Sequence, residues 1–482
     1  MAAISNSFFG GLDIESLVDQ FRQIELGPRS RIEFKQSGLE SRKQALNDLD
    51  SKLSTLFTLG QRFEDIILNV FNSKTAESSD SALFTVTAGT DAQLGAHSLT
   101  VSRLASIDTR VSKQYVSTDS DFGAIVTDQS FGIVVAHPTD ADPDNTVEIT
   151  VTISAATFSQ TNSEVLADVA SAINEAMSVA ATAETIDSDE AAVATVVTEA
   201  SGQSRLVLRS GQSGETNALT FNDTDGLLAT LETNANVQSS GTSGGFITVA
   251  SDLSALFTLD GLTFTRDNNF VEDALEGVGL QLLDTTSTTE SLTITADTEA
   301  VKAELQSFID AYNEVAKLLK TESASGGEFR GDTTYSTMRF KLRSLVSSLV
   351  SSAESTAFDQ LIEIGIGINR DGTLFFDDES AFESAVSTNP QLIKDIFTST
   401  DGITVTLNDF IINFTKSSGI INSSTDSIEA SLRRQTTRLE AFDDRLENRV
   451  QKFRNDLIRL QAVMVEVQSQ SGFLSNFGSF SF

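Results

Sequence analysis

Two histidines and several serine-rich stretches are the residues of this sequence that could do chemistry. His97 lies beside a glycine turn and His137 precedes Pro138, and neither belongs to an HExxH motif, a nucleophile elbow or a metal-ligand spacing. The serine-rich stretches have no histidine base nearby, and no glycine-rich phosphate loop precedes a helix with a lysine. We therefore expect no enzyme, no metal site and no cofactor, and we place both histidines in surface loops.

A run of alternate aspartates could bind calcium. Asp140, Asp142 and Asp144 would supply carboxylate oxygens to a hard cation. Position six of such a loop is Asn145 instead of Gly, however, and position twelve is Val151 instead of Glu. We favour the alternative, which is a solvated acidic turn stiffened by two prolines.

Composition and charge exclude several classes of function. Of the 482 residues, 39% are hydrophobic and 21% are charged, so the chain should fold, and its length suits about three domains. The net charge of −35 repels phosphate backbones and anionic lipids, so we expect neither nucleic-acid binding nor a membrane-surface role. Cysteine is absent, which removes disulfides and thiolate sites.

The start of the sequence does not read as a secretory signal. It has no basic segment, and Asp13 and Glu15 stand where an apolar core would lie. No apolar run approaches the roughly 18 to 20 residues that span a bilayer. We expect no membrane insertion, and export, if it occurs, by a route without a cleaved signal peptide.

Heptad-spaced apolar residues predict a long helix near each end of the chain. One seam runs from Leu39 to Val70 and the other from Ile428 to Val467, with spacings that alternate between three, four and seven residues. A shorter apolar stripe comes first and stops at Gly27-Pro28, which predicts a separate entry helix. The two long amphipathic helices are suited to pairing with each other.

These seams are the candidate functional site. A helical hairpin within one subunit needs the same leucines as a coil between subunits, and the length of the seams favours both uses. The predicted assembly positions are Leu12, Leu17, Phe21, Ile24, Leu39, Leu46, Leu49, Leu53, Leu56, Phe63, Leu432, Leu439, Phe442, Leu446, Phe453, Leu457, Leu460 and Met464.

Between the seams the period changes to that of strands. Residues 83–88 alternate, residues 98–103 continue after a glycine turn, and the two segments are predicted to form a hairpin. A helix is expected at 165–177. The order helix, sheet, mixed insert, sheet, helix predicts an α+β multidomain fold, in which a terminal coiled coil and helical bundle carry nested, inserted β-rich domains. The predicted parts are 1–38 plus 425–482 (terminal leg), 39–75 plus 298–424 (helical), 76–115 plus 246–297 (β-rich) and 116–245 (outer α/β insert).

Seven local motifs follow one another in a distinctive order along the chain. They are GLDIESLVDQ from Gly11 with Glu25 and Pro28, FTVTA from Phe84 after residues 76–80, LTVSRLA from Leu99, FTLDGLTFTR from Phe257, FIDAYN from Phe308, DGTL from Asp371 after residues 361–365, and the terminal coil. In this order they resemble the flagellar hook-associated protein 2, or FliD, family of filament-capping proteins. Residues 165–174, 205–210 and 214–221 are similar to an insert of flagellins and hook-associated proteins.

The resemblance implies a cap at the distal end of the growing filament. A homo-oligomer of four to six subunits would retain exported flagellin, promote its polymerisation and so permit filament elongation. Its further partners would be hook-filament junction proteins and an export chaperone. The protein would be extracellular, at the distal tip of the bacterial flagellum, after export by the flagellar type III apparatus without a cleaved signal peptide.

Three other functions stay open on the sequence. The exposed acidic outer segment could make the chain an adhesin for glycans or host surfaces, with or without a capping role. Helical ends also suit a hook-filament junction protein. An extracellular hydrolase has the least support.

Overall fold

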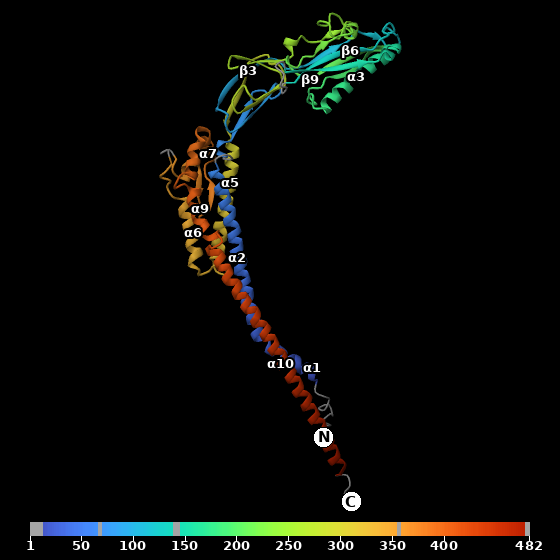
Figure 1. Cartoon of the computed structure of the whole chain (residues 1–482). Coiled ribbons are helices and arrows are strands. Elements are labelled where there is room, and N and C mark those ends of the chain that lie inside the picture. Colours follow the sequence, from blue (N-terminus) through green and yellow to red (C-terminus); the bar gives the residue numbers. More distant parts are fainter. Residues whose placement is uncertain (1–12, 66–69, 138–144, 354–357, 478–482) are drawn as a thin grey trace, which may run out of the picture. The chain divides into compact units, whose positions relative to one another are not determined.

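The structure is a computed structural model that describes residues 13–65, 70–137, 145–353 and 358–477, with side chains as far as residue 471 (Figure 1). The chain divides into two compact units. The first combines residues up to Phe71 with Thr298–Phe482, and the second comprises Asn72–Asp297. Within the described residues, no helix combines the length and apolarity that crossing a bilayer requires. The fold is α+β, with a largely helical first unit and a second unit rich in antiparallel strands.

Helices from both ends of the sequence build the first unit. Its two longest, α2 and α10, pack side by side (Figure 1). Its described helices are α1 (Ile14–Glu25), α2 (Gly27–Glu64), α5 (Thr298–Glu322), α6 (Thr333–Val346), α7 (Glu379–Thr388), α8 (Pro390–Thr398), α9 (Ile403–Thr415) and α10 (Ile420–Phe477). The 3-10 turns η1 (Val70–Asn72) and η4 (Leu361–Ile364) and the hairpin of β17 (Ile366–Ile368) and β18 (Leu374–Phe376) complete the set.

The predicted break between the entry helix and the long helix is confirmed. Asp13 caps α1 by accepting a hydrogen bond from the Ser16 N–H at 3.1 Å. Leu26 separates α1 from α2, and Pro28 stands in the first turn of α2, where its missing N–H costs no hydrogen bond. The long helix therefore starts at Gly27, well before the first residue of the predicted seam.

The described residues of the second unit form four antiparallel sheets with two hydrophobic clusters. The strand orders are β1-β16-β3-β12-β13, β14-β15-β2, β11-β4-β9-β5 with β8 on β9, and β10-β6-β7. The strands are β1 (Lys74–Ser78), β2 (Phe84–Ala88), β3 (Gly95–Arg103), β4 (Ile107–Val111), β5 (Tyr115–Val116), β6 (Gln129–Ala136), β7 (Thr146–Ile153), β8 (Val193–Ala200), β9 (Gln203–Ser213), β10 (Thr220–Asn222), β11 (Gly245–Phe246), β12 (Ala255–Leu259), β13 (Leu262–Arg266), β14 (Phe270–Val271), β15 (Val278–Leu282) and β16 (Glu290–Ala296).

Helical segments interrupt the strands at several places. The predicted helix at 165–177 is confirmed as α3, which begins earlier because Thr161 and Glu164 form a capping box. The described helical segments between the strands are η2 (Ala155–Ser159), α3 (Asn162–Thr182), α4 (Leu227–Leu231) and η3 (Ala250–Asp252).

The hairpin predicted from residues 83–88 and 98–103 is wrong. β2 pairs with β15, whereas β3 pairs with β12 and β16, so the two segments lie in different sheets. Each strand finds a partner from the far side of the 116–245 segment, which satisfies its backbone groups as well as a local hairpin would.

His97 lies in a strand instead of the predicted surface loop, whereas His137 lies in a loop as predicted but is mostly buried. His97 lies within strand β3, and its Nδ1 is 2.7 Å from Asp260 Oδ2. His137 directly follows β6, its side chain is 14% exposed, and its Nδ1 is 2.7 Å from Glu190 Oε2. Each histidine is thus held by a carboxylate far away in the sequence. The calcium prediction at Asp140, Asp142 and Asp144 lies outside the described residues.

A candidate assembly interface on the terminal helices

The entry helix α1 docks on α10 through a small apolar core. Val18, Leu446, Val450 and Leu457 are buried there. Further apolar residues, several of them predicted site positions, pack against this core: Ile14, Leu17, Phe21, Leu26, Phe442 and Phe453. The rings of Phe21 and Phe453 stack with centroids 4.4 Å apart and an interplanar angle of 21°.

Ion pairs line the same junction. Arg22 contacts Glu447 at 3.0 Å, and Arg449 makes a bidentate pair with Glu25 at 2.6 Å. Arg454 also pairs with Glu15. Because most of these side chains are well exposed, each pair contributes roughly 0 to 1 kcal/mol. These ion pairs determine the register of α1 on α10 more than they stabilise the contact between the two helices.

The polar first third of α2 pairs with α10 in the same way. Arg29 Nε donates to Asp443 Oδ1 at 2.9 Å, and this hydrogen bond raises the pKa of Arg29. About four turns further along α2, Lys43 Nζ contacts Glu429 Oε1 at 2.7 Å and lowers the pKa of that carboxyl. Charge complementarity, without an apolar seam, therefore extends the helix pair towards the start of α2.

Most predicted positions on α2 fill the core of their own chain. Phe63 joins an aromatic cluster with Phe71, Phe308 and Phe397, with ring centroids 5.4 to 5.6 Å from its own. Leu39, together with Leu432 and Leu439 of α10, is half-buried. The predicted positions at which no more than 1% of the residue is exposed are Leu46, Leu49, Leu53, Leu56 and Phe63.

A second group of predicted positions is exposed. Ile24 on α1 is 78% exposed, and Leu460 and Met464 on α10 are 49% and 42% exposed. Leu12 lies outside the described residues. The seam thus separates into a buried part that closes this chain and an exposed part that is available for another molecule.

The exposed part of α10 is larger than the seam predicted. We call it the α10 apolar segment, and it consists of Ile458, Leu460, Val463, Met464, Val465 and Val467, each between 42% and 60% exposed. Its members are spread around the helix, and a helix that is apolar on several sides is normally covered by more than one neighbour. The heptad rule misses Ile458, Val463 and Val465, although the run VMVEV at 463–467 was a local signal for the two valines.

The fold and the paired ends define a multidomain α+β protein whose terminal helix exposes a concentrated apolar surface, which is typical of proteins that assemble. Two protein-family models match this chain. The model described as "Flagellar hook-associated protein 2 N-terminus" matches residues 10–108, and the model described as "Flagellar hook-associated protein 2 C-terminus" matches residues 253–469.

Individual relatives agree with the family match. Flagellar hook-associated protein 2 of Escherichia coli (strain K12) is 28% identical over 98% of this chain and 98% of its own length. The A-type flagellar hook-associated protein 2 of Pseudomonas aeruginosa is 25% identical over 97% of this chain and 95% of its own. The crystal structure of the D1-D2-D3 domains of the Escherichia coli flagellar cap protein FliD has 25% sequence identity and a TM-score of 0.53, covering 80% of this chain and 99% of that one. The chain belongs to the flagellar hook-associated protein 2 family, a family of structural flagellar cap proteins.

Proposed function

We propose that this chain is a flagellar filament cap. It oligomerises at the distal end of the filament, retains exported flagellin and promotes its polymerisation, so that the filament elongates. Family membership supports the capping role, and the observation that carries the assembly step is the exposed α10 apolar segment. The match to hook-associated protein 2 favours the cap over a junction subunit.

The paired helices suggest how such a cap is built. The buried half of the seam holds α1, α2 and α10 together within a subunit, and the α10 apolar segment packs against neighbouring copies and the filament end. Each of these side chains is already about half-buried in the single chain, so removing the remainder of one from water contributes roughly 1 kcal/mol. The ion pairs at the junction are exposed and therefore individually weak, which suits contacts that must rearrange as each flagellin adds.

Other parts of the proposal rest on the family alone. The ring has four to six subunits, and hook-filament junction proteins and an export chaperone are further partners. The protein is extracellular, at the distal tip, and leaves through the flagellar type III apparatus without a cleaved signal peptide. The four-part domain division of the sequence is also retained as a proposal, and the two separate hydrophobic clusters of the second unit support it.

Substitution of the α10 apolar segment tests the assembly step. In the triple variant Val463→Ser, Met464→Ser and Val467→Ser, the oligomer should dissociate in analytical ultracentrifugation while the helical circular dichroism is unchanged. In cells that lack their own cap protein, the same variant should leave flagellin secreted but not polymerised. The matched control is Val179→Ser, an equally exposed valine on α3. Full oligomers and full-length filaments from the triple variant would exclude the segment as the interface.

A further inference from the structure

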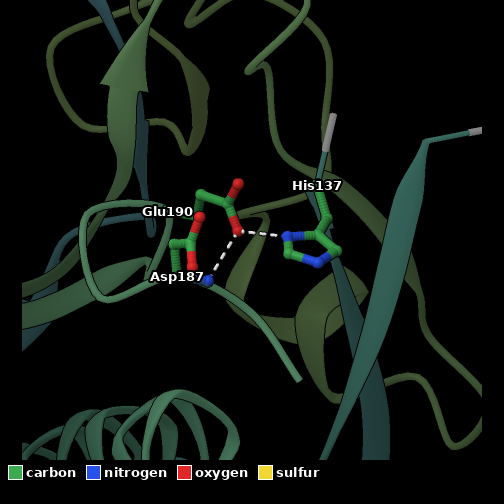
Figure 2. Close-up of side chains that lie close together, drawn as sticks. All are labelled: His137, Asp187 and Glu190. Carbon is green, nitrogen blue, oxygen red and sulfur yellow. Dashed lines mark hydrogen bonds and ion pairs between the residues drawn. The ribbon is translucent and has the colours of Figure 1, made fainter. Parts of the chain in front are cut away.

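His137, Asp187 and Glu190 come together from two distant parts of the second unit (Figure 2). His137 follows β6, and its N–H donates to the Asn145 carbonyl at 2.8 Å across the β6–β7 connection. Asp187 and Glu190 lie in the loop between α3 and β8. One potential ligand atom from each of the three side chains lies within 4.8 Å of the other two.

The carboxylate at the centre of this cluster is buried. The Glu190 side chain is 5% exposed and that of His137 is 14% exposed, whereas Asp187 faces solvent. Glu190 Oε2 accepts hydrogen bonds from His137 Nδ1 at 2.7 Å and from the Asp187 N–H at 2.8 Å. A buried carboxylate is costly unless donors or positive charge compensate it; these two donors do so here, and a cation in place of the histidine proton would do so as well.

The loop that carries the two carboxylates is held firmly. Ile186 and Ala192 are buried in the hydrophobic cluster around α3. Gln212 on β9 donates to Asp189 Oδ2 at 2.7 Å, and a Cβ at Gly211 would overlap the Asp189 carbonyl oxygen, so the loop lies directly on β9. The potential ligands are therefore placed by the fold in advance of any binding.

We propose that this cluster binds a divalent transition-metal ion such as Zn²⁺. His137 Nδ1, Glu190 and Asp187 supply three ligands, and water completes the coordination. A mixed nitrogen and oxygen donor set suits zinc, whereas calcium and magnesium prefer oxygen alone. Two carboxylates balance the charge of a divalent cation and the imidazole binds neutral, which reduces the cost of the partly buried position.

The His137 and Glu190 atoms need only a small change to accept the ion, and the exposed Asp187 side chain closes in from within 4.8 Å. Zinc ligands at about 2.0 to 2.1 Å in a tetrahedron are about 3.3 Å from each other. The gap between His137 Nδ1 and Glu190 Oε2 would therefore open from 2.7 Å by about 0.6 Å, with the ion replacing the proton that the two atoms share. The bound ion would tie the end of β6 to the α3–β8 loop.

The other histidine of the chain provides an internal control. His97 Nδ1 also lies 2.7 Å from a carboxylate oxygen, that of Asp260. Among the residues that the structure describes, however, His97 belongs to no group of three potential ligands. Because the chain has only two histidines and no cysteine, few other nitrogen or sulfur donors could compete for a transition metal.

Zinc titration of the metal-free full-length chain tests the proposal. Calorimetry should show one Zn²⁺ per chain, and affinity should fall at least about tenfold in His137→Gln and in Asp187→Asn but not in His97→Gln. Asp187 is exposed, so its variant keeps the test valid if changes at the buried Glu190 impair folding, and circular dichroism checks each variant. Cobalt substitution should give visible absorption bands that His137→Gln removes. Absence of stoichiometric binding, or loss of binding in His97→Gln instead of His137→Gln, would overturn the proposal.

Discussion

Removing the Phe453 ring should release the entry helix from α10. Phe453 stacks on Phe21, and both rings pack against the small core that joins the two helices. A fully buried Phe→Ala change costs about 3 to 5 kcal/mol, and because both rings are half-buried we expect about 2 kcal/mol for Phe453→Ala. That energy corresponds to a roughly 30-fold increase in the fraction of molecules with α1 detached.

Hydrogen exchange followed by mass spectrometry measures this change directly. Amides of α1 should exchange roughly 30-fold faster in Phe453→Ala, whereas those of α5 and α9 should be unaffected because they lie outside this core. The control is Phe34→Ala, which removes a ring that is 82% exposed on α2. Unchanged protection of α1 in Phe453→Ala, or an α1 without protection in the parent chain, would refute the proposed docking.

Two further predictions concern backbone and pH. Gly38→Ala should raise the free energy of unfolding by up to about 1 kcal/mol, because Gly38 is helical with open space around its Cβ position. Gly245→Ala should instead lower it by about 2 kcal/mol or more, since φ is +125° and the new Cβ would overlap the Asn236 carbonyl; urea denaturation distinguishes the two. Hydrogen bonds from the hydroxyls and N–H groups of residues 351–352 hold the pKa of Asp401 well below its usual range. A carboxyl whose pKa is lowered by folding stabilises the folded chain at pH values above its unfolded pKa of about 3.9, and this stability is lost as the pH falls through the folded pKa. Asp401→Asn should therefore destabilise the chain at pH 7 and progressively less below about pH 4. A difference in unfolding free energy that does not depend on pH would contradict this.

The long helices could be predicted from the sequence because their determinants are local. Heptad spacing located α10 and most of α2, and fourfold spacing located α3. The first twelve residues of α2 were missed because they carry no apolar seam. Their helix pairs with α10 through contacts such as Arg29 with Asp443, which join residues more than 400 positions apart. Periodicity cannot reveal a contact of that kind.

The sheets and the histidine cluster depend on pairing that local patterns do not encode. Leu280 lies opposite Val86 although nearly 200 residues separate them, so the alternation of residues 83–88 indicated a strand without its partner. Similarly, His137 meets Glu190 only because β6 and the α3–β8 loop converge. The apolar spacing of the seams also did not distinguish Leu53, buried in its own chain, from Leu460, which is exposed.

The capping role can be tested most directly by locating the protein on growing flagella. The full-length chain would be expressed in a flagellated strain that lacks its own cap protein, and immunogold labelling would be examined by electron microscopy. We predict restored filaments with label at the distal tip, and secreted monomeric flagellin without filaments when the triple variant of the α10 apolar segment is used. Label at the hook-filament junction, or filaments that elongate equally without the chain, would contradict a cap.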